Sequence, residues 1–149
     1  MTMVKILLSV VLLIGCVQVP PKEYFGDWYV VQPLHTSGVS ALSDSEAHSL
    51  IGRRVSYGPQ AMRSGATQCE RPRYDEVRYS QDEFLAANRI GAREIGITDD
   101  FIFEVDVRQE SGSMCSGIGR IFFVKDATML VVMHEGVYFE MRRSSPSIK

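Results

Sequence analysis

Three histidines are the residues best suited to metal binding or acid–base chemistry in this 149-residue chain. His35, His48 and His134 lie far apart, and none has a Cys, Asp or Glu at a spacing that builds a metal cage. The serines form no G-x-S-x-G motif, and no phosphate-binding glycine loop with a lysine is present. The sequence therefore predicts no catalytic residues, no metal and no cofactor, and we expect a protein that is not an enzyme.

Two carboxylates held across a substrate could hydrolyse a glycoside, and Asp99, Asp100, Glu104 and Asp106 lie close enough in sequence to consider. Phe101, Phe103, Val105 and Val107 alternate with Ile102, Glu104, Asp106 and Arg108. This alternation is typical of a half-buried antiparallel strand whose polar face is solvated. We favour that interpretation of the carboxylates.

The chain has three cysteines, Cys16, Cys69 and Cys115. If Cys16 is used for lipidation, as argued below, an even pair remains in an oxidising compartment. We expect a disulfide between Cys69 and Cys115. The alternative is two buried free thiols.

Charge is nearly balanced, with 16 Lys and Arg against 18 Asp and Glu and a net charge of -2. This balance argues against nucleic-acid binding and, with 45% hydrophobic residues, fits one globular domain, which we expect to be monomeric. The middle of the chain is locally basic and could bind an acidic partner or a lipid headgroup. Interspersed acidic residues favour a mixed surface instead. The arginines concerned are Arg53, Arg54, Arg63, Arg71, Arg73 and Arg78.

The first 15 residues are typical of a signal peptide, with Lys5 before an apolar run too short to span a bilayer. Leu13-Ile14-Gly15-Cys16 resembles the bacterial lipobox, which implies a lipid on Cys16 and a membrane anchor. Val17, in place of Asp, resembles lipoproteins sorted to the outer membrane, here facing the periplasm. An ordinary secretory signal is the alternative. We expect a tether over residues 16–23, a domain over 24–143 and a flexible tail over 144–149.

The mature chain predicts a mainly β fold with two short helices. Strand-like runs cover residues 24–31, 53–57, 74–79, 101–107, 118–124, 128–133 and 137–143. Capping boxes, Ser43 with Glu46 and Ser80 with Glu83, predict helices near 44–50 and 81–87. A helical turn ending at Gly96 is expected over 92–96, and a loop around Cys69. Many short strands favour a small antiparallel barrel or sandwich.

Gly26-Asp27-Trp28 resembles the G-x-W signature of lipocalins and the wider calycin group. The resemblance implies a barrel closed at one end by Trp28 beneath a cation from the last strand, Arg142 or Arg143. Two helices in mid-chain depart from the family pattern of one helix after the barrel. The other interpretation of Trp28 is an ordinary core residue.

Two functions follow. The first is a lipocalin-like barrel that binds a small apolar or amphipathic ligand, with Phe101, Phe103, Phe123, Val131 and Tyr138 as lining residues. The second is a module for a protein partner, such as an inhibitor of an envelope hydrolase or a periplasmic accessory protein. Its candidate surface is the pair of loops over 58–68 and 109–119, which adjoin Cys69 and Cys115.

Overall fold

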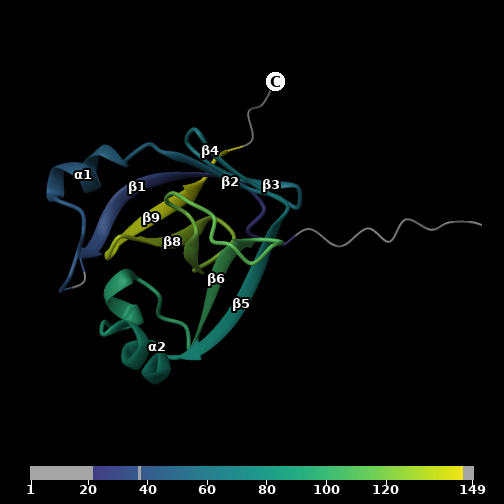
Figure 1. The fold of residues 1–149 in the computed structure, drawn as a ribbon. Coiled ribbons are helices and arrows are strands. Elements are labelled where there is room, and N and C mark those ends of the chain that lie inside the picture. The colour runs from purple at the N-terminus through teal and green to yellow at the C-terminus, as the bar shows by residue number, and fades with distance from the viewer. Residues whose placement is uncertain (1–21, 37, 146–149) are drawn as a thin grey trace, which may run out of the picture.

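A computed structural model describes residues 22–36 and 38–145, which form a nearly closed antiparallel barrel of nine strands with two α-helices (Figure 1). The expected fold class is confirmed. In chain order the elements are β1 (Gly26–Thr36), α1 (Asp44–Ser49), β2 (Arg54–Tyr57), β3 (Ala61–Ser64), β4 (Thr67–Glu70), β5 (Pro72–Ser80), α2 (Gln81–Asn88), the 3-10 helix η1 (Ala92–Ile95), β6 (Phe101–Gln109), β7 (Ile121–Val124), β8 (Met129–His134) and β9 (Val137–Arg143). The expected signal peptide, Cys16 and most of the tail lie outside the described residues.

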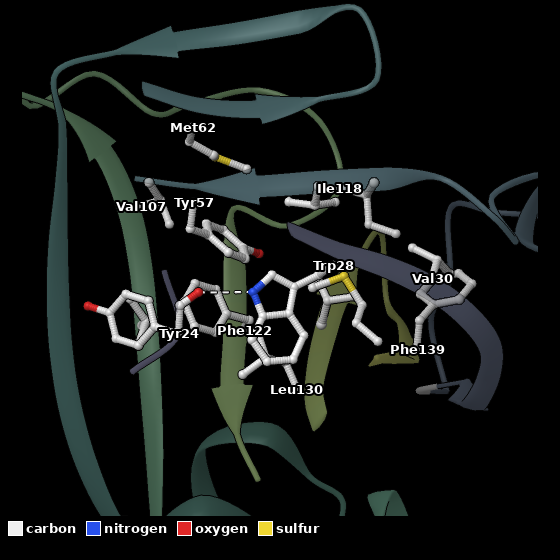
Figure 2. Close-up of a cluster of buried hydrophobic side chains, with 14 of the residues drawn as sticks. Tyr24, Trp28, Val30, Tyr57, Met62, Val107, Ile118, Phe122, Leu130 and Phe139 are labelled. Atoms are coloured by element: carbon white, nitrogen blue, oxygen red, sulfur yellow. Dashed lines mark hydrogen bonds between the residues drawn. The ribbon is translucent and has the colours of Figure 1, made fainter. Parts of the chain in front are cut away.

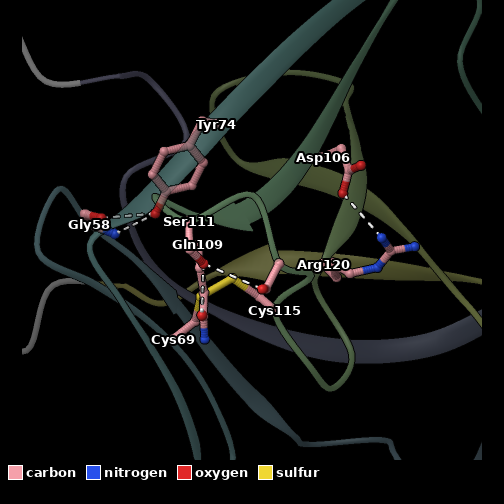
Figure 3. The surroundings of a disulfide bond; sticks show 9 residues. Gly58, Cys69, Tyr74, Asp106, Gln109, Ser111, Cys115 and Arg120 are labelled. Atoms are coloured by element: carbon pink, nitrogen blue, oxygen red, sulfur yellow. Dashed lines mark hydrogen bonds and ion pairs between the residues drawn. A yellow bond between two sulfur atoms is a disulfide. The ribbon is translucent and has the colours of Figure 1, made fainter.

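The sheet has the order β4-β3-β2-β1-β9-β8-β7-β6-β5. Strands that pair in the sheet are therefore consecutive in sequence, with one exception. β1, the first strand, also pairs with β9, the last strand. β4 and β5 are the two edges of the sheet that the described residues form, and no strand ladder joins one to the other. We call the gap between them the seam. Tyr74 bridges the seam, because its hydroxyl donates to the carbonyl of Gly58 at 2.9 Å and accepts from the amide of Gly58 at 3.1 Å (Figure 3).

Both predicted capping boxes are present. The backbone amides of Ser43 and Ser80 donate to the side chains of Glu46 and Glu83 at 2.8 and 2.7 Å, and the two serine hydroxyls accept from the glutamate amides. These reciprocal bonds satisfy amides that the first helical turn leaves without partners. The predicted turn over 92–96 is η1, and Gly96 closes it in the left-handed region at φ 81°.

Two apolar clusters lie on opposite faces of the sheet. The inner cluster fills the barrel around Trp28, Tyr57, Phe122, Leu130 and Phe139, each at most 3% exposed (Figure 2). The outer cluster lies beneath α2 and η1. It consists of Phe84, Ile90, Ala92, Ile95, Ile97, Ile102, Phe123, Val131 and Tyr138. Part of the sheet is therefore buried on both faces.

One expectation about secondary structure is wrong. The stretch around Cys69, expected to be a loop, is the hairpin of β3 and β4, in which Met62 pairs with Cys69. Each of these strands has only four residues and few apolar side chains, so the alternation that marks a strand is too short to recognise. The turn between them needs Gly65, whose φ is 59°.

Candidate functional site

One end of the barrel is closed by Trp28 and Arg143. The guanidinium carbon of Arg143 lies 4.3 Å from the centroid of the Trp28 ring, which is fully buried, and the two residues pair across β1 and β9. The indole Nε1 donates to the carbonyl of Tyr24 at 2.9 Å. A guanidinium attracted to an indole face can thus close the barrel without burying an unpaired charge. The contact is compatible with the arrangement that the G-x-W resemblance implies.

The register selects Arg143 over Arg142 for this role. Arg142 points to the opposite face of β9, where its Nε donates to Oε1 of Glu140 at 2.6 Å. Burial of Glu140 acts to raise the pKa of its carboxyl, but hydrogen bonds from Arg142 and Gln32 outweigh burial and hold that pKa below its ordinary value.

Arg143 also fixes the N-terminal segment, residues 22–25. Its Nη1 donates to the carbonyl of Phe25 at 2.8 Å, its Nη2 donates to the carbonyl of Glu23, and its Nε donates to the carbonyl of Ala127 at 2.7 Å. The segment is held on its other side by Glu76, which accepts from Lys22 at 2.7 Å and from the Tyr24 hydroxyl at 2.8 Å. The bond from Lys22 lowers the pKa of Glu76, whereas burial raises the pKa of Tyr24.

A small groove lies between the N-terminal segment and β6, with a volume of about 290 Å³. Tyr24, Phe103, Val105 and Val124 give it apolar walls, and Lys22, Glu23 and Glu76 lie at its polar margin. This groove is at the same end of the barrel as Trp28 and Arg143, because Val124 ends β7 just before the turn that contains Ala127. We call it the apolar groove.

The predicted ligand-lining residues do not gather around one cavity. Phe123, Val131 and Tyr138 belong to the outer cluster beneath α2, at most 3% exposed. Phe101 and Phe103 lie at the start of β6, 48% and 49% exposed, and only Phe103 lines the apolar groove. The barrel interior is filled by the inner cluster, where the rings of Tyr57 and Phe122 lie 4.5 Å apart.

The predicted disulfide between Cys69 and Cys115 is present, with the two Cα atoms 5.6 Å apart (Figure 3). It joins β4 to residues 109–119, which comprise the end of β6 and most of the connection from β6 to β7. We call these residues the pinned loop. Backbone bonds order its tip, since Gln109 donates to Ser113 and Gly112 donates to Gln109, both at 2.8 Å. Its end returns to the barrel, where the Tyr57 hydroxyl donates to the carbonyl of Gly119 at 2.8 Å.

The pinned loop contributes to two grooves. The first, of about 630 Å³, is lined by Gln68, Glu70, Arg71, Gln109, Glu110 and Ser111. The second, of about 590 Å³, is lined by Met114, Cys115, Ser116, Gly117, Arg120, Met133, His134, Glu135 and Gly136. Met114 is 65% exposed on this loop. The sequence shows that Met114 is next to Cys115, but it does not show that the Met114 side chain is exposed.

The residues considered for catalysis have structural surroundings. His35, His48 and His134 lie on β1, α1 and β8, and the described part of the chain has no group of three or more His, Cys, Asp or Glu placed to hold a metal ion. Asp106 accepts from Arg108 at 2.6 Å and from Arg120 at 3.3 Å. Burial, with Asp106 nearby, raises the pKa of Glu104.

Three of the six arginines in the basic middle are paired with carboxylates. Arg54 bonds to Asp27 at 2.6 Å, Arg73 to Asp75 at 2.8 Å, and Arg71 lies 3.6 Å from Glu110. Arg78 differs, because its guanidinium lies 4.6 Å from the centroid of the Phe101 ring and has no ion pair or hydrogen bond within the described ranges. Sequence reasoning missed this contact, since it depends on the register of β5 against β6.

No helix among residues 22–36 and 38–145 is long and apolar enough to cross a membrane. Comparisons with protein-family models, with curated proteins and with solved structures find no match to this chain.

Proposed function

We propose that the protein is an envelope-anchored lipoprotein whose barrel is a non-catalytic binding module for a partner protein. The observation that carries the proposal is the pinned loop, which lines two grooves and presents Met114, 65% exposed, in one of them. Because the disulfide and the backbone bonds already order this loop, a partner would bind it at a low entropic cost.

The composition of this surface also suits a protein. Methionine and arginine are enriched at protein interfaces, and here Met114 lines a groove together with polar groups of both signs, including Arg120 and Glu135. A central apolar side chain with a mixed polar margin fits a folded partner better than it fits a small apolar molecule. Partners of that kind would be an envelope hydrolase, which the protein would inhibit, or a periplasmic complex, which it would assist.

The test is site-specific photocrosslinking in the native cell envelope, with the crosslinker at position 114 or, as a control, at Leu85 on α2, which is 50% exposed. We expect a discrete protein adduct from position 114 only. The purified partner should then bind Met114→Asp at least about tenfold more weakly than it binds Leu85→Asp, since a hot-spot side chain contributes more than about 1.4 kcal/mol. Equal binding of the two variants, or no adduct from position 114, would contradict the proposal.

The apolar groove favours a second candidate function, the binding of a small apolar or amphipathic ligand. Its walls include Phe103, one of the residues predicted from the sequence to contact a ligand. Native mass spectrometry of protein purified without detergent tests this function. A reproducible small-molecule adduct that Phe103→Ser removes would support a ligand carrier, whereas a bare mass would contradict it.

A further inference from the structure

Two aromatic side chains are exposed side by side at the start of β6. Phe101 and Phe103 are 48% and 49% exposed and lie two residues apart on one face of the strand. Val105 and Val107, on the same face further along β6, are fully buried in the barrel. The apolar face of β6 thus continues beyond the part that the barrel covers.

Arg78 completes this surface from β5. It pairs with Phe103 across the strands, and its guanidinium lies over the ring of Phe101. Glu83 attracts this guanidinium, but no described carboxylate lies within ion-pair distance of it. The guanidinium can therefore bind an anionic oxygen while it stacks on an aromatic ring. We call Phe101, Phe103 and Arg78 the aromatic end.

The N-terminus connects this surface to the proposed lipid anchor. Lys22 lines the same groove as Phe103 and lies only six residues after Cys16. Six residues span at most about 20 Å, even when fully extended. A lipid on Cys16 would therefore hold the aromatic end near the bilayer surface. The tip of the pinned loop lies at the other end of β6, beyond Gln109.

We infer that the aromatic end docks on the bilayer that carries the lipid anchor, with Phe101 and Phe103 in the interfacial region and Arg78 beside lipid phosphates. This inference rests on the anchoring at Cys16 that we proposed above. A weak contact is sufficient, because a short tether gives the surface a high effective concentration at the membrane. Docking would leave the pinned loop directed away from the membrane.

The driving force is apolar rather than electrostatic. Glu76 neutralises Lys22, and the exposed Asp99 and Asp100 lie next to Phe101 in the chain. Acidic side chains around the aromatic end thus offset the charge of Arg78, and docking should persist at high salt and on zwitterionic vesicles.

The experiment uses the full lipidated protein, its acyl mass confirmed, in phosphatidylcholine vesicles with brominated acyl chains, which quench tryptophan. Trp28 is fully buried and serves as an internal background. Phe103→Trp places a reporter at the aromatic end, and Met114→Trp places a matched reporter on the pinned loop. We expect quenching of the Phe103→Trp protein only, unchanged at high salt and reduced by adding Phe101→Ser.

The outcomes separate the anchor from the docking. Failure of the wild-type protein to carry lipid and float with vesicles would overturn the anchor and the inference that rests on it. Stable flotation with equal, low quenching of both reporters would leave the anchor intact and overturn the docking. Quenching of the Phe103→Trp protein by a monomeric brominated fatty acid, without quenching in vesicles, would overturn it in favour of a small-ligand site.

Discussion

At the scale of single residues, Arg143 joins three separate parts of the chain. It stacks on Trp28 of β1 and donates to carbonyls of the N-terminal segment and of the turn between β7 and β8. A planar, permanently charged side chain with several donors is suited to this role, and lysine would not reproduce it. Because one wall of the apolar groove is the N-terminal segment, Arg143 also holds that groove in shape.

Gly26 should be needed for this arrangement. Its φ is 131°, and a Cβ at this position would lie 2.8 Å from Nη1 of Arg143. We expect Gly26→Ala to lower the free energy of unfolding by about 2 kcal/mol, because backbone strain adds to displacement of the guanidinium. Gly38→Ala is the control, since a Cβ there meets nothing within 4 Å. Chemical denaturation measures both, and equal stabilities would contradict the expectation.

At the scale of elements, α2 and η1 act as a cover for the outer face of the sheet. Phe84 of α2 is fully buried, and its ring lies 5.2 Å from that of Phe123 on β7. This cover explains why β7 and β8 have almost continuous apolar runs. Strands buried on both faces do not alternate, so their sequence does not show which side chains face inward.

Loss of the α2 cap should destabilise the whole domain. We expect Ser80→Ala to cost about 1 kcal/mol of unfolding free energy, because it removes an N-cap from a helix that carries Phe84 into the outer cluster. Ser43→Ala removes the same cap from α1, which buries only Ala47. Thermal unfolding should therefore show the larger effect for Ser80→Ala. A larger effect of Ser43→Ala would show that α2 is not part of the cooperative unit.

The sequence predicted most of the helices and strands, but for several strands it did not show which side chains share a face of the sheet. Capping boxes are local, so both helices could be placed from Ser43 and Ser80 alone. The choice between Arg142 and Arg143, and the contact of Arg78 with Phe101, depend on strand register. Strand register is set by packing across the barrel, so it cannot be read from a local sequence pattern. The pairing of Cys69 with Cys115 was accessible because cysteine counting left only that pair.

At the scale of the whole molecule, the seam between β4 and β5 is where the barrel does not close through a strand ladder. Side-chain and covalent contacts cross it instead, from Tyr74 to Gly58 and from Cys69 to the pinned loop. The disulfide therefore contributes in two ways, since it limits the unfolded chain and holds the candidate partner surface against the barrel.

Removal of the disulfide should lower the free energy of unfolding. The cysteines are 46 residues apart, and closure of a loop of that length stabilises a protein by about 4 kcal/mol in the chain-entropy model. We expect the Cys69→Ser, Cys115→Ser double variant to lose stability of that order, and amide exchange to accelerate first in the pinned loop. Denaturation with and without reductant provides a second measurement. Unchanged midpoints in both experiments would show that the seam is stable without the crosslink.

The pairing of β1 with β9 sets the order in which this barrel can be assembled. Trp28 lies opposite Arg143, so β1 can pair early with β2 but must wait for the last strand before its ladder with β9 can form. Such distant pairings raise contact order and slow folding to the range of milliseconds to seconds. Until then, the exposed edge and the aromatic residues of the nascent N-terminal hairpins are open to aggregation. A chain of this topology should therefore depend on holding chaperones in proportion to the time between the emergence of β1 and that of β9.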